Sequence, residues 1–112
     1  MDGTLDYEYA AGDTLQTWGY TCKVDDEAYS LTGHTVRIRI YPLSVGAWSE
    51  YAATVVSAAA GTVSFAPSDA AIIVSTGAGF YGVVWEVTRT SDGKILTFPD
   101  TGYLLAKVHG LG

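Results

Sequence analysis

The sequence predicts an all-β fold, either an antiparallel sandwich or a barrel, from three observations. In residues 35–41, Val36, Ile38 and Ile40 alternate with polar side chains, which is the period-2 pattern of a half-buried strand. Residues 80–90 repeat this alternation with larger aromatic and β-branched side chains. Turn signals recur at intervals of about 8–12 residues, a spacing typical of sandwiches and barrels rather than α/β folds.

The rest of the chain is expected to supply the layer that packs against the apolar face of the central strand at 35–41. Further strands are expected at 14–24, 50–57, 62–66, 80–90, from 95 onward, and around 104–108. Asp92-Gly93 predicts a tight hairpin between two of them, because this pair readily adopts positive φ. One or two helical turns are expected within residues 67–74, where Ser68 or Asp69 can cap a short helix.

The chain is expected to form one domain with a short extension at each end. Its 112 residues suffice for one hydrophobic core. Residues 12–109 are assigned to the sandwich and residues 110–112 to a flexible tail. Residues 1–11 are interpreted as an acidic N-terminal arm that becomes ordered against a neighbouring subunit, with an edge strand as the alternative.

The net charge of −6 is concentrated near the N-terminus, where seven acidic residues and one Lys precede residue 28. Such a surface argues against nucleic-acid binding, which needs Lys and Arg to neutralise phosphates. It suits a basic partner surface or simply solubility. No apolar run approaches the ~20 residues of a membrane span. The first residues lack the basic and apolar regions of a signal peptide, so use without classical secretion is expected.

No catalytic, metal or cofactor site is predicted. Cys22 is the only cysteine, so no intrachain disulfide can form, and its strand position favours a buried, inert thiol over a nucleophile. His34 and His109 are interpreted as a turn residue and a tail residue, since no spacing matches a zinc site. A Gly-x-Ser-x-Gly elbow, a phosphate-binding loop and a spaced calcium loop are all missing from the sequence.

Eight residues are predicted to contact a partner protein. They are Asp6, Tyr7, Glu8 and Tyr9 in the arm, Arg37, Arg39 and Tyr41 on the polar face of the central strand, and Trp48 in the following loop. Arg offers a planar multi-donor head and aromatic rings offer contact area at low entropy cost. The alternative for the two arginines is a solvated sheet face. Trp48 is either an exposed contact anchor or sugar-stacking platform, or a ring folded over the end of the sandwich.

Several short motifs support a resemblance to a known family. They are Gly12-Asp13-Thr14-Leu15, the stretch 30–40, the stretch 61–65, Gly79-Phe80-Tyr81, Trp85-Glu86-Val87 and Asp92-Gly93. From Gly12 to Val108 the chain resembles the immunoglobulin-like β-sandwich of tailed-bacteriophage structural proteins. This type is similar to the N-terminal domain of siphophage baseplate upper proteins and occurs in phage tail, fibre and head-decoration subunits. A disulfide-linked Cys–Trp–Cys core is excluded by the single cysteine.

The resemblance implies a non-enzymatic virion structural protein, made in the host cytoplasm, that forms a homo-oligomer and docks on a capsid or tail lattice. Baseplate upper proteins continue into a coiled coil and receptor-binding portions, whereas this chain stops at Gly112. A capsid decoration or other small accessory subunit is therefore expected. The alternatives are a tail, baseplate or fibre-associated subunit, and a carbohydrate-binding host-adhesion module that uses Trp48 and exposed Tyr. No cofactor, nucleic acid or membrane is implied.

Overall fold

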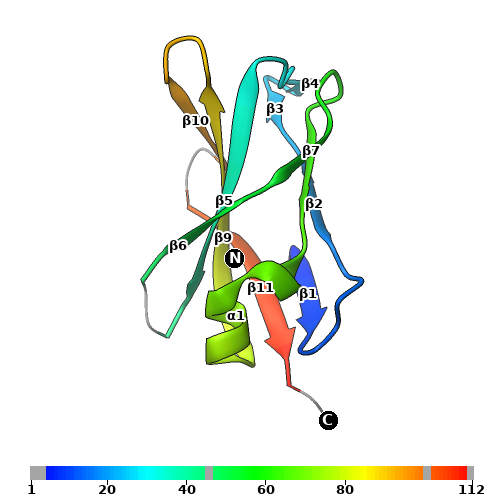
Figure 1. Cartoon of the computed structure of the whole chain (residues 1–112), viewed down its shortest axis with the longest axis vertical. Coiled ribbons are helices and arrows are strands. Elements are labelled where there is room, and N and C mark those ends of the chain that lie inside the picture. The colour runs from blue at the N-terminus through cyan, green and yellow to red at the C-terminus, as the bar shows by residue number, and fades with distance from the viewer. Residues whose placement is uncertain (1–4, 45–46, 100–101, 111–112) are drawn as a thin grey trace.

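Two β-sheets face each other in the computed structural model of the chain, which describes residues 5–44, 47–99 and 102–110 (Figure 1). The strands are β1 (Tyr7–Ala10), β2 (Trp18–Thr21), β3 (Lys23–Val24), β4 (Glu27–Ala28), β5 (His34–Pro42), β6 (Ser49–Ala52), β7 (Thr54–Ser57), β8 (Thr62–Phe65), β9 (Gly79–Arg89), β10 (Ile95–Phe98) and β11 (Leu104–His109). The all-β prediction is therefore confirmed.

The larger sheet contains six strands. Its order is β1-β11-β9-β5-β6, with β10 also paired to β9. The long strands β5 and β9 form its centre and pair antiparallel from His34–Arg89 to Pro42–Tyr81. Because β10 and β11 both pair antiparallel with β9, they occupy successive halves of one strand position.

The smaller sheet contains three strands in the order β2-β8-β7, and β3 and β4 form a separate hairpin. The two sheets do not close into a barrel, and their division of strands is that of an immunoglobulin-like sandwich. At the start of β9, the Tyr81 hydroxyl donates a hydrogen bond to the Gly77 carbonyl at 2.5 Å. This is the tyrosine corner found at the same position in such sandwiches.

The core lies between the two sheets and follows the predicted alternation. Val36, Ile38 and Ile40 of β5 are at most 5% exposed, and the inward residues of β9 are buried as well. Trp85 is fully buried and its indole N–H donates to the Tyr7 hydroxyl at 3.0 Å. Cys22 is also fully buried, as predicted, and burial raises the pKa of its thiol to about 11.

The expected helical turns are present between β8 and β9. A 3-10 turn, Pro67–Asp69, precedes the helix α1 (Ala71–Thr76). Neither Ser68 nor Asp69 caps α1, because Ala70 occupies the N-cap position and makes no side-chain cap. The backbone N–H of Ile72 instead donates to the Tyr51 hydroxyl at 2.9 Å. Among the described residues, no helix is long and apolar enough to cross a membrane.

The prediction of an N-terminal arm is wrong for residues 7–10, which form the edge strand β1. This strand pairs parallel with β11, with Tyr7 opposite Ala106 and Ala10 opposite His109, so the sheet is mixed rather than purely antiparallel. His109 consequently belongs to a strand and not to the tail. The tyrosines alternate with acidic residues, and burying the tyrosine side of the segment offsets the entropy lost on ordering it.

Two expected strands also differ from the structure. The segment 50–57 is divided at Ala53, so that β6 belongs to the larger sheet and β7 to the smaller one. The segment 14–24 contains only β2 and the separate β3, and Val24 is 43% exposed. Between β3 and β4 lies a tight turn in which Asp25 and Asp26 both have positive φ, a conformation that Asp tolerates better than most residues.

Candidate interaction face

The predicted contact residues lie mostly on one surface, which we call the outer face: the side of the six-stranded sheet that points away from the three-stranded sheet. Because Val36, Ile38 and Ile40 point into the core, the alternation directs the other side chains of β5 outward. Arg37, Arg39 and Tyr41 therefore share the outer face. The register places Tyr7 and Tyr9 opposite the buried residues Ala106 and Val108, so the acidic residues Asp6 and Glu8 take the outward positions.

Tyr7 and Tyr9 are structural residues of the chain's own core. Tyr9 is 3% exposed, and its hydroxyl donates to the Asp13 carbonyl at 2.6 Å. The Tyr7 ring stacks on Trp18 at a centroid distance of 5.2 Å, and burial raises the pKa of Tyr7 well above its usual range. The predicted partner contact of Tyr9 is therefore not compatible with the structure, because its ring is buried, whereas the contact of the partly exposed Tyr7 stays a prediction.

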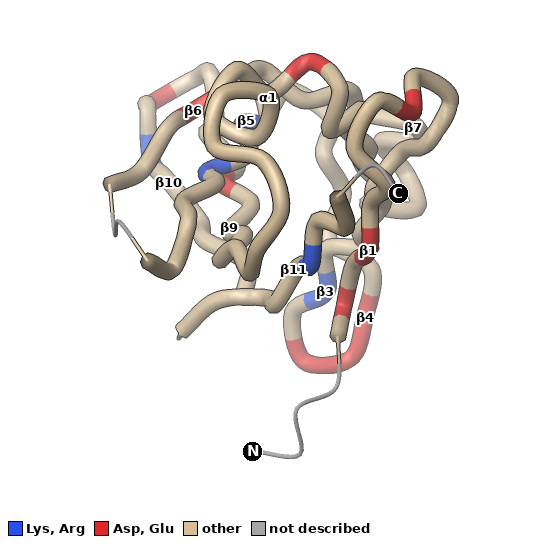
Figure 2. The backbone as a smooth tube through the Cα atoms, turned by 90° about the horizontal axis from the view of Figure 1, so that it is seen from below, with Lys and Arg blue, Asp and Glu red and all other residues tan. Residues whose placement is uncertain are grey.

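Asp6 and Glu8 are exposed, and each has a partner within the chain. The Asp6 carboxylate accepts a hydrogen bond from the Leu105 N–H at 2.9 Å, and Glu8 lies 2.9 Å from His109 Nε2. Figure 2, seen along the long axis, shows acidic positions of β1 and of the β3–β4 hairpin on the same side of the molecule. Figure 1 separates them toward opposite ends. The acidic residues thus do not form one continuous patch.

Four charged side chains form a network on the outer face. Arg39 contacts Glu50 through Nε and Glu86 through Nη2, both at 2.7 Å, and Arg37 contacts Glu50 at 3.2 Å. Glu86 is only 8% exposed, so its carboxylate depends on Arg39 for a counter-charge. The Arg37 side chain is 61% exposed and is the member of the network most available to a partner.

Three aromatic rings form a cluster beside this network, and we call Tyr41, Trp48 and Tyr103 the aromatic cluster. The Tyr41 and Trp48 centroids lie 3.9 Å apart, and Tyr103 meets Tyr41 edge-on at 5.7 Å. Trp48 is 45% exposed and Tyr103 is 41% exposed. Trp48 thus packs against Tyr41 while much of its side chain stays exposed, and its role as a contact anchor stays a prediction. Burial and the neighbouring Tyr103 hydroxyl raise the pKa of Tyr41.

The cluster depends on two special features of the sheet. The Tyr41 ring lies so close over Gly82 that a Cβ on this residue would collide with it. The second feature is the interruption between β10 and β11. β10 ends with Phe98 opposite Trp85 and β11 begins with Leu104 opposite Val83, so that Val84 is the one residue of β9 between these two pairs. Tyr103, directly before β11, lies on the outer face against Tyr41. The sequence analysis missed Tyr103, and the only available signal was the Pro99 and Gly102 punctuation around it.

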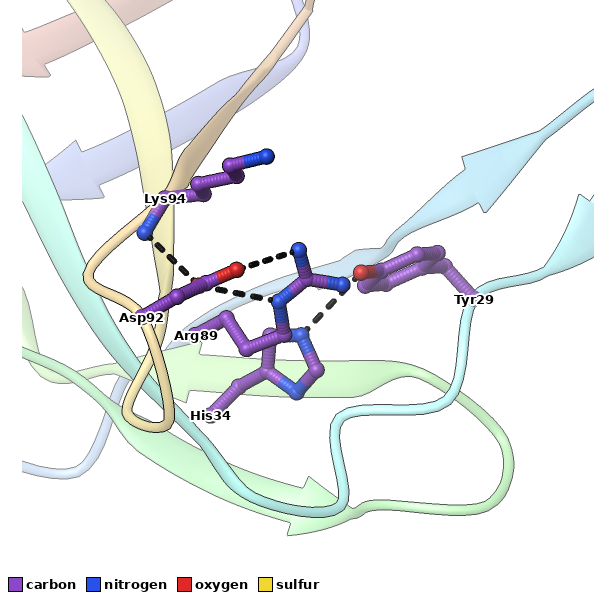
Figure 3. Close-up of polar contacts among 5 residues, drawn as sticks. All are labelled: Tyr29, His34, Arg89, Asp92 and Lys94. Atoms are coloured by element: carbon purple, nitrogen blue, oxygen red, sulfur yellow. Dashed lines mark hydrogen bonds and ion pairs between the residues drawn. The ribbon is translucent and has the colours of Figure 1, made fainter.

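A polar cluster at the other end of the sandwich is satisfied internally (Figure 3). His34 Nδ1 lies 2.8 Å from the Thr32 carbonyl, which can only accept, so in the neutral ring Nδ1 donates and Nε2 accepts from the Tyr29 hydroxyl at 3.0 Å. Arg89 and Asp92 form two hydrogen bonds of 3.0 and 2.7 Å, which lower the pKa of Asp92 and raise that of Arg89. Among the described residues, no group of three or more His, Cys, Asp or Glu is placed to hold a metal ion.

No protein-family model matches the chain, and no curated protein matches it. The class is therefore defined by the fold alone, as an immunoglobulin-like β-sandwich. Its most distinctive exposed chemistry is an outer face that joins an aromatic cluster to an arginine–glutamate network.

Proposed function

We propose that this chain is a non-enzymatic structural subunit of a bacteriophage virion. In this proposal it docks on a larger viral lattice, as a capsid decoration or other accessory subunit, and associates with copies of itself. The outer face is the docking surface, and the observation that carries this proposal is the meeting of Arg37, Tyr41 and Trp48 on one exposed side of the sheet. Exposed aromatic rings beside arginine are enriched where proteins bind each other.

The phage assignment rests on the sequence motifs between Gly12 and Val108 that resemble phage immunoglobulin-like domains. The arrangement of side chains on the outer face gives the docking part of the proposal a second kind of support. Arg39 and Glu86 hold each other at 2.7 Å, and the Tyr41 ring packs over Gly82, so these groups already have partners within the chain before another protein arrives. A preorganised surface loses less entropy on binding, which suits a subunit that must stay attached.

The first test is the copy number of this chain in purified particles, measured by quantitative mass spectrometry against the major capsid protein. A ratio near one per capsid subunit, or a simple fraction of it, is expected for a decoration role. A few copies per particle would assign the chain to the tail, baseplate or fibre instead. Absence from particles would contradict the proposal.

The second test locates the docking surface. Trp48→Ala combined with Arg37→Glu should reduce occupancy on particles at least tenfold, because both side chains are exposed anchors of the outer face. Leu15→Ala is the matched control, since Leu15 is 94% exposed and lies outside this face. Equal occupancy of the double variant and the control would remove the outer face from the proposal.

A second candidate is a carbohydrate-binding host-adhesion module, and the aromatic cluster is the observation that favours it. Partly exposed rings such as Trp48 and Tyr103 can stack on the apolar faces of sugars. Titration with host polysaccharide, followed by Trp fluorescence, should then show binding that Trp48→Ala abolishes while docking on particles persists. If polysaccharide has no effect on the wild-type fluorescence, this candidate is wrong.

A further inference from the structure

The edge strands of this sandwich are protected unequally, and β10 is the exception. On β1, the Trp18 indole N–H donates to the Glu8 carbonyl at 3.2 Å, which occupies part of the open edge. On β2, the Gly19 carbonyl accepts from the Tyr7 hydroxyl at 2.9 Å. The edge strand β6 carries the charge of Glu50. Such devices oppose pairing with another chain.

The remaining edge of the smaller sheet, β7, is also protected, because its register with β8 shifts between Val55 and Ser57. A bulge of this kind twists an edge away from a straight partner strand. By contrast β10 has the sequence Ile-Leu-Thr-Phe, carries no charge, and keeps a regular register with β9 over its whole length. Ile95 is 55% exposed and Leu96 is 40% exposed.

The backbone of β10 offers hydrogen bonds on its free side. The Arg89 N–H donates to the Lys94 carbonyl at 2.8 Å, which makes this a hydrogen-bonded pair of the β9–β10 ladder. Because such pairs alternate in an antiparallel ladder, the backbone groups of Leu96 face β9 and those of Ile95 and Thr97 face away from it. Figure 1 shows no strand on that side of β10.

A second copy of this chain fits the open edge, and we propose that two copies associate through antiparallel pairing of their β10 strands. The inference deepens the self-association in the proposed function and rests on it for biological context. A two-fold axis at Leu96 pairs Ile95 of each copy with Thr97 of the other, so both copies present the same donors and acceptors to each other. The two six-stranded sheets then form one continuous sheet.

The surroundings of β10 suit this partner in shape. A cavity of about 360 Å³ runs beside the strand and has apolar walls at Tyr20, Leu96 and Phe98. Leu96 of the second copy would lie against this cavity. The same register places Lys94 of the second copy opposite Phe98, beside a cavity that both Lys23 and Asp25 line. Figure 3 shows the Lys94 side chain extending away from Arg89 and Asp92.

The decisive backbone test uses Thr97, whose N–H faces away from β9. Thr97→Pro removes this donor without removing a bond of the β9–β10 ladder, and Thr97→Ala is the matched control that keeps the N–H. Sedimentation velocity should show a dimer for the wild-type chain and for the control. The proline variant should dimerise at least about tenfold more weakly, because each copy loses a hydrogen bond.

A cross-linking test fixes the register. Leu96→Cys places two thiols across the two-fold axis at a non-hydrogen-bonded pair, where the Cα atoms of antiparallel strands are about 4.5 Å apart and a disulfide can form. Thr97→Cys is the control. Its two thiols would both lie on the face of the sheet opposite to that of Leu96, too far from each other to form a disulfide. The buried Cys22 of the wild-type chain should give no covalent dimer.

Each outcome decides the proposal. A wild-type chain that stays monomeric at every concentration, a Thr97→Pro variant that dimerises like Thr97→Ala, or cross-linking of Thr97→Cys in preference to Leu96→Cys would overturn it. These results are separate from the virion proposal. A monomer that still occupies particles refutes only the strand pairing, whereas a β10-paired dimer that never occupies particles refutes only the docking.

Discussion

The two sides of the six-stranded sheet use the same alternating strands for different purposes. The inner side of β9 is closed, because Tyr81, Val83 and Trp85 are fully buried against the second sheet. The outer side has no second layer, yet Val84 and Glu86 are still no more than 8% exposed. Tyr41 lies over Gly82 and Arg39 pairs with Glu86, so side chains of the sheet itself provide much of this cover. The buried inner side stabilises the fold, whereas the outer side, which is covered largely by side chains of its own sheet, keeps ordered groups available for contact with a partner.

The largest expected difference between the two sides is in the free energy of unfolding of two Trp variants. Trp85→Ala should lower it by about 3–5 kcal/mol, because a large cavity opens in the core and the Tyr7 hydroxyl loses its indole partner. Trp48→Ala should cost less than about 1 kcal/mol, since half-exposed surface residues contribute little. Urea unfolding followed by circular dichroism measures both. Equal losses would mean that the aromatic cluster belongs to the core.

The next largest effect concerns the pH dependence of the interior. Folding raises the pKa of the Cys22 thiol to about 11, so the folded chain holds this proton more tightly than the unfolded chain does. The associated stability is complete below the ordinary thiol pKa and is lost as the pH rises from about 9 toward 11. Cys22→Ala should therefore decline less steeply over this range. Urea titrations of both chains between pH 8 and 11 measure the difference, and parallel curves would contradict the burial argument.

A smaller contrast lies within the charged network of the outer face. Glu86→Gln should destabilise the fold by about 1–2 kcal/mol, because a nearly buried carboxylate that balances Arg39 is lost. Glu50→Gln should cost less than about 1 kcal/mol, and this cost should shrink in high salt, since its ion pairs are exposed. Urea unfolding at low and high salt separates the two. A larger effect from Glu50 would show that the exposed pairs hold the face.

The sequence predicts the inner side of the sheet better than the outer side. Period-2 alternation in 35–41 and 80–90 identifies the buried residues without knowing which strands are neighbours, because every inward side chain must be apolar. Which side chains lie together on the outer face depends on which strands are neighbours in the sheet. Tyr103 reaches Tyr41 only because the strand position beside β9 is interrupted between the end of β10 and the start of β11, and this register is set by distant pairings. The division of 50–57 at Ala53 is hidden for the same reason.

The N-terminal segment illustrates a related limit. Alternation of Tyr7 and Tyr9 with acidic residues is compatible with an edge strand of this chain and with an arm bound to another subunit, since both bury one side. What decides between them is the free edge of β11, which the segment itself cannot reveal. The short apolar sequence of β10 indicates a strand without this ambiguity. That one of its edges is exposed follows only from the order of the strands in the sheet.

The smallest expected change in stability comes from Gly82→Ala, which tests how the outer face is covered. The added Cβ would meet Cε1, Cζ and the hydroxyl of Tyr41, which is the far end of a side chain that can rotate away. The fold should lose less than about 1 kcal/mol, while the displaced ring leaves Trp48 more open to solvent. Acrylamide quenching measures this directly, because Trp18 and Trp85 are at most 2% exposed and Trp48 is the accessible indole. Stronger quenching at nearly unchanged stability is expected. A loss comparable to that of Trp85→Ala would instead mean that Tyr41 is locked in place and supports the sheet as a core residue does.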